Sequence, residues 1–184
     1  TSLIGRLASI VMLPDTPAKA AYLTAFSRWV DNGYKTTEGT GPCFKSDGTV
    51  FHHRHHYPAY AVDGFSGGAV NAVWLLSKTR FAVSEESHAI LKRALLEMRF
   101  YCNLRSFPLA LSGRHPDGRG ALVPWHYARL AVAGSPDGRE QIDPQLAAAY
   151  LRVSPGEDRY TRLFAEKGFA AKPSPEGTHV YGYN

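Results

Sequence analysis

The stretch SEESHAILKRALLEMRFY, residues 84–101, is the clearest helical segment of the sequence. Ser84 is a favoured N-cap residue, and the two glutamates that follow it suit the positive end of a helix dipole. Apolar residues then recur at spacings of three and four, which places them on one helical face. These residues are Leu91, Ala94, Leu95 and Met98. The segment predicts an amphipathic helix and a core that helices supply.

Similar patterns predict helices on both sides of this segment. Upstream, Thr16 followed by Pro17 marks the start of a helix, and Gly33 marks its end. Tyr22, Phe26, Trp29 and Val30 share one face of that helix, and we expect Trp29 and Trp74 to lie in the core. We expect Ser66 to cap a helix over residues 69–78. Three more helices are predicted over residues 123–133, 144–152 and 158–167.

The segments between these helices carry the signals of long loops. Residues 36–48 are rich in glycine, threonine and proline, and Pro58 with the following glycines predicts an ordered loop over residues 52–64. The segment KPSPEG (172–177) has the composition of a linker, and THVYGYN (178–184) alternates like a strand. The pattern is mainly α, with residues 1–170 forming one helical domain and residues 171–184 a linker and the start of another.

Composition limits the classes of partner and compartment. The formal net charge of +5 over 184 residues favours an anionic partner. No basic recognition helix or RNA-binding signature is evident, so nucleic acid is not predicted, and no apolar run approaches the ~18 residues of a membrane span. Cys43 and Cys102 lack metal-binding spacing and are predicted to be free, buried thiols. Because the chain begins in an apolar run and ends in a strand-like one, we expect it to be an internal piece of a longer protein.

The stretch DGTVFHHRHHYPAY, residues 47–60, holds four histidines, one arginine and two tyrosines. A metal site is one interpretation, but the histidines stand in adjacent pairs whose side chains diverge, and no third ligand has a recognisable spacing. A polar loop whose histidines bond to backbone carbonyls is a second interpretation. A third is proton chemistry, because the DGT turn and Pro58 restrict a loop that carries histidine and tyrosine beside an arginine. The residues alone leave all three open.

Removing a proton next to a carboxylate would need such side chains. The reaction requires a base and a group that takes up the charge that develops on the carboxylate. A phenol has a reference pKa near ~10, so lowering it to ~7 requires about 4 kcal/mol of preferential stabilisation of the phenolate. Guanidinium and imidazole groups can supply this stabilisation.

DGTVFHHRHHYPAYAVDGF, followed by FPLALSGRHP, resembles the catalytic region of polysaccharide lyase family eight, in particular its chondroitin sulfate ABC lyases. The resemblance covers roughly residues 1–180 in chain order. It implies an incomplete α/α toroid of helical hairpins, followed by a β-sandwich domain that begins near the end of this chain. It also implies a carbon–oxygen lyase that cleaves an anionic glycosaminoglycan beside a hexuronate by β-elimination.

The resemblance implies roles for individual residues. Tyr60 resembles the tyrosine that takes the C5 proton and returns one to the leaving oxygen. His53 resembles the histidine that helps to neutralise the uronate carboxylate, and Arg114 resembles the arginine near the tyrosine and bridging oxygens. His52 and His115, beside these positions, are predicted to line the substrate cleft. Arg54 and Arg119 are predicted to meet sulfate or carboxylate groups, since a guanidinium suits planar oxyanions.

Parts of the family's constellation do not match this chain. The family's further asparagine and histidine lie upstream, and its glutamate lies in the β-sandwich beyond Asn184, so we expect the isolated chain to be weakly active or inactive. The resemblance implies a periplasmic or secreted bacterial protein. No metal ligand or cofactor is assigned, and a calcium requirement of the longer protein stays open. The alternatives are a non-catalytic binder of acidic glycans and a metalloenzyme built on the histidine cluster.

Overall fold

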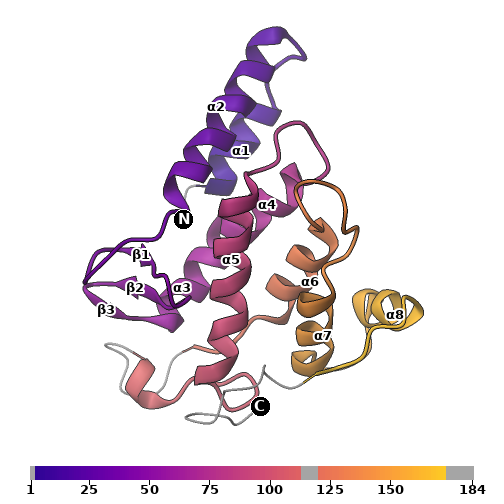
Figure 1. Cartoon of the computed structure of the whole chain (residues 1–184). Coiled ribbons are helices and arrows are strands. Elements are labelled where there is room, and N and C mark those ends of the chain that lie inside the picture. The colour runs from indigo at the N-terminus through magenta and orange to yellow at the C-terminus, as the bar shows by residue number, and fades with distance from the viewer. Residues whose placement is uncertain (1–2, 113–119, 173–184) are drawn as a thin grey trace.

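The computed structural model describes residues 3–112 and 120–172, and they are mainly helical (Figure 1). The α-helices are α1 (Leu3–Val11), α2 (Pro17–Gly33), α3 (Pro58–Gly64), α4 (Val70–Leu76), α5 (Glu85–Glu97), α6 (Pro124–Ala133), α7 (Pro144–Val153) and α8 (Arg159–Glu166). A π-helical segment η1 (Phe65–Ala69) joins α3 to α4, and 3-10 turns are formed by η2 (Met98–Tyr101) and η3 (Leu109–Leu111). The mainly α prediction is confirmed. The toroid and the β-sandwich stay predictions, and the predicted strand at residues 178–184 lies outside the described residues.

A small antiparallel sheet was not predicted. Its strands β1 (Cys43–Phe44), β2 (Val50–His52) and β3 (His55–His56) pair in the order β1-β2-β3 and lie beside α3 (Figure 1). The predicted DGT turn joins the first two strands, where the backbone N–H and the hydroxyl of Thr49 both donate to the Asp47 carboxylate, at 2.9 and 2.7 Å. The prediction of a loop over residues 52–64 is wrong. Its first part is a hairpin, and its last seven residues form α3.

Helix α3 forms because its proline stands where a helix tolerates one. Pro58 lies in the first turn of α3, where the backbone N–H has no partner inside the helix. Of the glycines that were expected to mark the ordered loop, Gly64 is the last residue of α3, and Gly67 and Gly68 lie in η1, where Gly68 has a non-helical φ of 147° and forms a kink. A kink at Gly68 separates α3 from α4, and Ser66 lies before that kink, inside η1, so it is not the N-cap of α4. Its hydroxyl is 2.9 Å from Nε2 of the buried His126 on α6.

The other helices follow the sequence closely. Helix α5 begins at the expected cap, where the Ser84 hydroxyl accepts a hydrogen bond from the backbone N–H of Ser87. Its apolar face is buried, and α6 packs against both α4 and α7. Tyr127 on α6 is fully buried and donates from its hydroxyl to the Leu95 carbonyl of α5, at 2.7 Å. Each large apolar side chain buried in this way contributes about 1.5–3 kcal/mol to stability.

Two expectations about burial were wrong. Trp29 is 45% exposed, although Phe26 and Val30 on the same helix are buried, and Trp74 is only partly buried under the guanidinium of Arg129. Both cysteines are free, as predicted, but only Cys102 is buried, whereas Cys43 is exposed. Within the described part of the chain, no helix is long and apolar enough to cross a membrane.

A column of aromatic rings fixes the sheet to the helices. Tyr34, just after α2, meets Phe44 of β1 edge-on with ring centroids 5.6 Å apart, and Phe44 stacks on Phe65 of η1 at 6.3 Å. The Tyr34 hydroxyl donates to the Ala69 carbonyl at 3.0 Å, and all three rings are buried. The sheet and α3 are therefore held against the same column.

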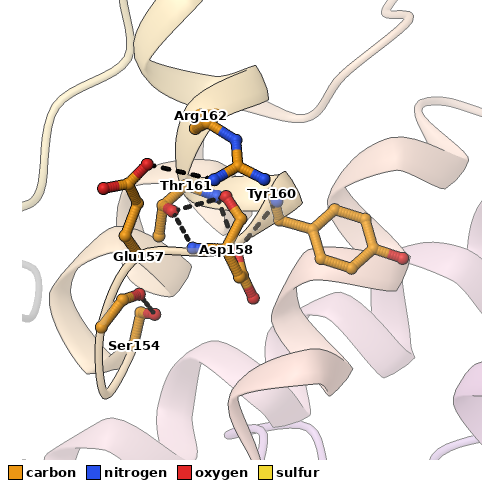
Figure 2. Close-up of polar contacts among 7 residues, drawn as sticks. Ser154, Glu157, Asp158, Tyr160, Thr161 and Arg162 are labelled. Carbon is orange, nitrogen blue, oxygen red and sulfur yellow. Dashed lines mark hydrogen bonds and ion pairs between the residues drawn. The ribbon is translucent and has the colours of Figure 1, made fainter.

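Figure 2 shows how α8 begins. The Asp158 carboxylate accepts hydrogen bonds from the backbone N–H groups of Tyr160 and Thr161, both at 2.9 Å, and the Thr161 hydroxyl accepts one from the Asp158 backbone at 2.6 Å. Partial burial opposes ionisation of Asp158, but hydrogen bonds from Tyr150 and Thr161 outweigh it and lower the pKa of this carboxyl below its usual value. The helix therefore starts at a charged capping box.

We expect Asp158→Ala to lower the free energy of unfolding by about 1–2 kcal/mol, because it removes the side-chain acceptor of the cap. A carboxyl with a lowered pKa stabilises the fold above its unfolded pKa, and this contribution disappears as the pH falls through the folded value. Urea unfolding of the chain at pH 7 and at pH 3 measures both effects. Asp158→Asn is the control, because it keeps an acceptor and loses the charge. If Asp158→Ala and Asp158→Asn lowered the free energy of unfolding equally at pH 7, the result would contradict the role of the cap.

Candidate functional site

The candidate site is built on the β2–β3 hairpin and the first turn of α3. The pairing of His52 with His55 leaves only His53 and Arg54 in the turn, with positive φ values of 54° and 66°. Positive φ at both central residues is typical of a type I′ hairpin, which usually has asparagine and glycine there. This turn places two bulky side chains in the left-handed region, at a cost of order 1–3 kcal/mol for each residue.

Three rings meet at this hairpin. His52 stacks on Tyr60 of α3 with ring centroids 3.9 Å apart, and His53 meets the same tyrosine at a right angle at 5.7 Å. The Nδ1 atoms of His52 and His53 are 2.6 Å apart, so that one imidazole donates a hydrogen bond and the other accepts it. We call His52, His53 and Tyr60 the hairpin cluster. It brings together three of the seven predicted site residues.

The hairpin cluster is open on one side and supported on the other. Tyr60 is 39% exposed, and in the described ranges no group forms a hydrogen bond with its hydroxyl. Tyr57 is buried and packs beneath Tyr60, with ring centroids 5.5 Å apart. A partly exposed phenol that packs on a buried ring is accessible to a ligand.

Burial sets the charge of the first histidine. Desolvation lowers the pKa of His52 below its usual value, and the charges of His53 and His55 lower it further. The lowered pKa favours the neutral imidazole, which keeps one ring nitrogen as a hydrogen-bond acceptor. His56, at the other side of the hairpin, also has its pKa lowered by burial, and its ring packs edge-on against Tyr101 at 4.6 Å.

Two cavities meet the hairpin cluster. One, of about 330 Å³, is lined largely by apolar and aromatic side chains that include Trp29 and Phe65, and His52 and Tyr60 form part of its wall. The other, of about 540 Å³, lies between residues 40–42 and the hairpin, and His52, His53 and Arg54 form its wall on that side. His52 borders both cavities, so the cluster lies where they adjoin.

Lys45 is a charged group that the sequence did not single out. It is 8% exposed and donates from Nζ to the hydroxyl and carbonyl of Thr37, at 2.9 and 3.1 Å, and to the carbonyls of Glu38 and Gly41. Its Nζ also stands 4.8 Å from the ring centroid of Phe51. None of the ion pairs found among the described residues involves Lys45. Nothing in a KSDG sequence distinguishes this lysine from a surface lysine.

The remaining predicted site residues cannot be placed. Arg114, His115 and Arg119 lie outside the described residues. The described residues contain no group of three or more histidine, cysteine, aspartate or glutamate side chains that could hold a metal ion. His52, His53, Arg54 and Tyr60 are thus the predicted site residues whose positions are known, and Arg54 is exposed at the tip of the hairpin.

Comparison with known proteins gives a consistent set of relatives. The chain is 48% identical to a chondroitin sulfate ABC exolyase of Bacteroides thetaiotaomicron over 202 aligned positions, which cover the whole chain and 20% of that protein. It is 37% identical to a chondroitin sulfate ABC exolyase of Proteus vulgaris, over the whole chain and 18% of that protein. A chondroitin sulfate ABC endolyase of the same organism is 28% identical over 95% of the chain and 17% of its own length.

The chain thus spans about a fifth of the length of the curated relatives that it matches. The family model described as "Lyase, catalytic" matches residues 1–160, which is most of the chain. The chain therefore belongs to this family of catalytic lyase regions, and it corresponds to a fragment of the chondroitin sulfate ABC lyase type.

Proposed function

We propose that the longer protein containing this chain is a polysaccharide lyase that cleaves chondroitin sulfate or dermatan sulfate beside a hexuronate by β-elimination. Tyr60 removes the proton on C5 of the uronate, the C4–O4 bond breaks, and a double bond forms between C4 and C5. The leaving oxygen takes up a proton from the same phenol. No water is consumed, and the new non-reducing end is unsaturated.

The observation that carries this proposal is the contact of His53 with Tyr60. Tyr60 follows His53 by seven positions in the sequence, and the hairpin turn and the start of α3 bring their rings to 5.7 Å at a right angle. A uronate seated over the exposed phenol would place its carboxylate within reach of an imidazole. The similarity to proteins named chondroitin sulfate ABC lyases supports the same assignment.

The other residues take supporting roles in the proposal. His53 helps to neutralise the uronate carboxylate as negative charge develops, and Arg114 stabilises the phenolate and the bridging oxygen through a fork of N–H donors. His52, Arg54, His115 and Arg119 bind the substrate. The proposal assigns the protein to the periplasm or to secretion, as an enzyme of bacterial glycosaminoglycan degradation, and needs no metal for the proton transfer.

A direct test is to mix the longer protein with chondroitin sulfate and to follow the ultraviolet absorbance of the unsaturated uronate. We expect absorbance to rise in step with the loss of polymer length. Binding of the glycan with no rise in absorbance would favour a non-catalytic glycan-binding protein. A metalloenzyme would be favoured if the polymer were cleaved with no rise in absorbance and if a chelator abolished that cleavage.

Replacing Arg114 with lysine is expected to lower kcat by about ten- to a hundredfold, because an ammonium cannot reproduce two parallel N–H donors at fixed spacing. The initial rate of absorbance change at saturating substrate measures the effect. Arg80→Lys, at an exposed arginine in the turn after α4, is the matched control. Equal rates for the two variants would remove Arg114 from the proposed site.

A further inference from the structure

The cavity between residues 40–42 and the hairpin is a feature that the proposed proton transfer does not use. It has a volume of about 540 Å³, enough for a sugar substituent and its surrounding water. Its lining residues are Thr40, Gly41, Pro42, His52, His53 and Arg54. None of these carries a carboxylate, so the lining contributes no negative side chain.

Positive charge approaches this cavity from two sides. Arg54 lies on the solvent side, at the tip of the hairpin. Lys45 lies on the inner side, because its buried ammonium donates to the carbonyl of Gly41, which lines the cavity. Among the described residues, the partners of this ammonium are carbonyl and hydroxyl oxygens, with no carboxylate among them. The field of a cation in a low-dielectric wall favours an anion nearby.

The backbone of the hairpin also points to use of this cavity. Both His53 and Arg54 have positive φ values, although asparagine or glycine would adopt this turn with less strain. Strained positions of this kind cluster at ligand sites, where the side chain itself is needed. One strained residue belongs to the hairpin cluster, and the other lines the cavity.

We propose that this cavity is a subsite for a sulfate ester of the glycan, with Arg54 as the residue that recognises it. The inference rests on the proposed function. Chondroitin sulfate alternates a uronate with a sulfated hexosamine, so a sulfate lies one sugar from the carboxylate that meets the hairpin cluster. Because His52 stacks on Tyr60 and also lines the cavity, the subsite is one ring away from the reacting phenol. Lys45 acts as a positioning residue that holds the wall formed by Gly41.

Uronate carboxylates are a second source of negative charge, and two substrates separate them. Sulfated chondroitin and chemically desulfated chondroitin carry the same carboxylates and differ in the ester. Arg54→Gly is the informative variant, since it removes the guanidinium and relieves the positive φ at the same time. Lys78→Gly is the matched control. It too removes an exposed cation at a positive φ, of 60°. Toward the described residues, the Lys78 ammonium makes one long hydrogen bond, of 3.4 Å, to the Gln141 carbonyl in a different loop.

The experiment measures kcat/KM of the longer protein on both polymers. For Arg54→Gly, the ratio of sulfated to desulfated kcat/KM is expected to fall about tenfold, the loss of one charge-assisted contact. For Lys78→Gly the ratio is expected to stay at the wild-type value. Both variants are expected to unfold at higher temperature than the wild type, which shows that neither has lost its fold.

If Arg54→Gly lowered kcat/KM by the same factor on both polymers, the sulfate subsite would be overturned and Arg54 would be assigned to the carboxylates. If Arg54→Gly kept the wild-type kcat/KM on both polymers, any role of Arg54 in binding would be overturned. The proposed function fails separately, if the wild type yields no unsaturated product from either polymer. In that case, affinities of the wild type and of Arg54→Gly for sulfated and desulfated oligosaccharides, measured by calorimetry, still test the subsite.

Discussion

Tyr60→Phe in the longer protein is expected to reduce the turnover of chondroitin sulfate by about a thousandfold or more, with little change in affinity for the polymer. The substitution keeps the ring that stacks on His52 at 3.9 Å and removes only the oxygen that would carry the proton. General acid–base groups contribute about 10²–10⁴-fold to rates, and this one would act twice, first as base and then as acid. The rate of ultraviolet absorbance change and calorimetric binding of the polymer measure the two quantities.

Tyr57→Phe is the control for this prediction. Tyr57 belongs to the same packed group of rings, but it is buried and serves as support for Tyr60. Its loss of turnover is expected to be far smaller than that of Tyr60→Phe. Comparable losses for the two variants would mean that packing of the rings, and not the Tyr60 oxygen, matters. Retained turnover in Tyr60→Phe would remove the phenol from the mechanism altogether.

The second large effect is expected on stability. Gly134, at the end of α6, has a φ of 69°, and a Cβ there would overlap the carbonyl oxygen of Glu140 and lie 3.0 Å from that of Gln141. Gly134→Ala is therefore expected to lower the free energy of unfolding by about 3 kcal/mol or more, from the left-handed backbone together with the overlap. Because the obstructing atoms are backbone, a side-chain movement cannot relieve the clash. Urea unfolding of the chain measures the change.

Gly138 lies in the same loop and separates the two causes. Its φ of 75° is similar, but a Cβ there would meet no atom within 4 Å. Gly138→Ala is expected to lower the free energy of unfolding by only about 1–2 kcal/mol, from the backbone strain alone. If both variants lost the same stability, the close approach of the loop to Gly134 would be disproved.

Much of the fold could be predicted because the helices carry strong local signals. Ser84 and its two following glutamates mark the start of α5, and the spacing of its apolar residues matches the buried face. The sheet lacks such signals. Its strands are two or three residues long, and its tight turn contains His53 and Arg54 where a sequence-based rule looks for asparagine and glycine.

The misplaced boundary at α3 has a related cause. Proline and glycine usually mark loops, yet Pro58 occupies the first turn of a helix, and Gly68 forms a kink between two helices with no loop between them. Trp29 was expected in the core because it lies near Phe26 and Val30 in the helical repeat, but only their side of α2 is covered. Periodicity shows which residues share a face, and tertiary packing decides how much of that face is buried.

The candidate site could be predicted in part from the sequence. The stretch around residues 47–60 indicated a cluster of histidines and tyrosines, and the resemblance to polysaccharide lyase family eight assigned roles to His53 and Tyr60, whose rings lie 5.7 Å apart in the structure. The direct stacking of His52 on Tyr60 and the buried position of Lys45 required the fold, because both depend on a hairpin that the sequence did not reveal. The roles of Arg114, His115 and Arg119 stay predictions.

The most direct test of the central claim is to cleave chondroitin sulfate with the longer protein in water enriched in the heavy oxygen isotope ¹⁸O. The masses of both products are then measured by mass spectrometry. Elimination initiated by Tyr60 consumes no water, so we predict that neither product gains heavy oxygen and that each cut creates one unsaturated uronate. Heavy oxygen in either product, with saturated ends, would show hydrolysis and would contradict the account.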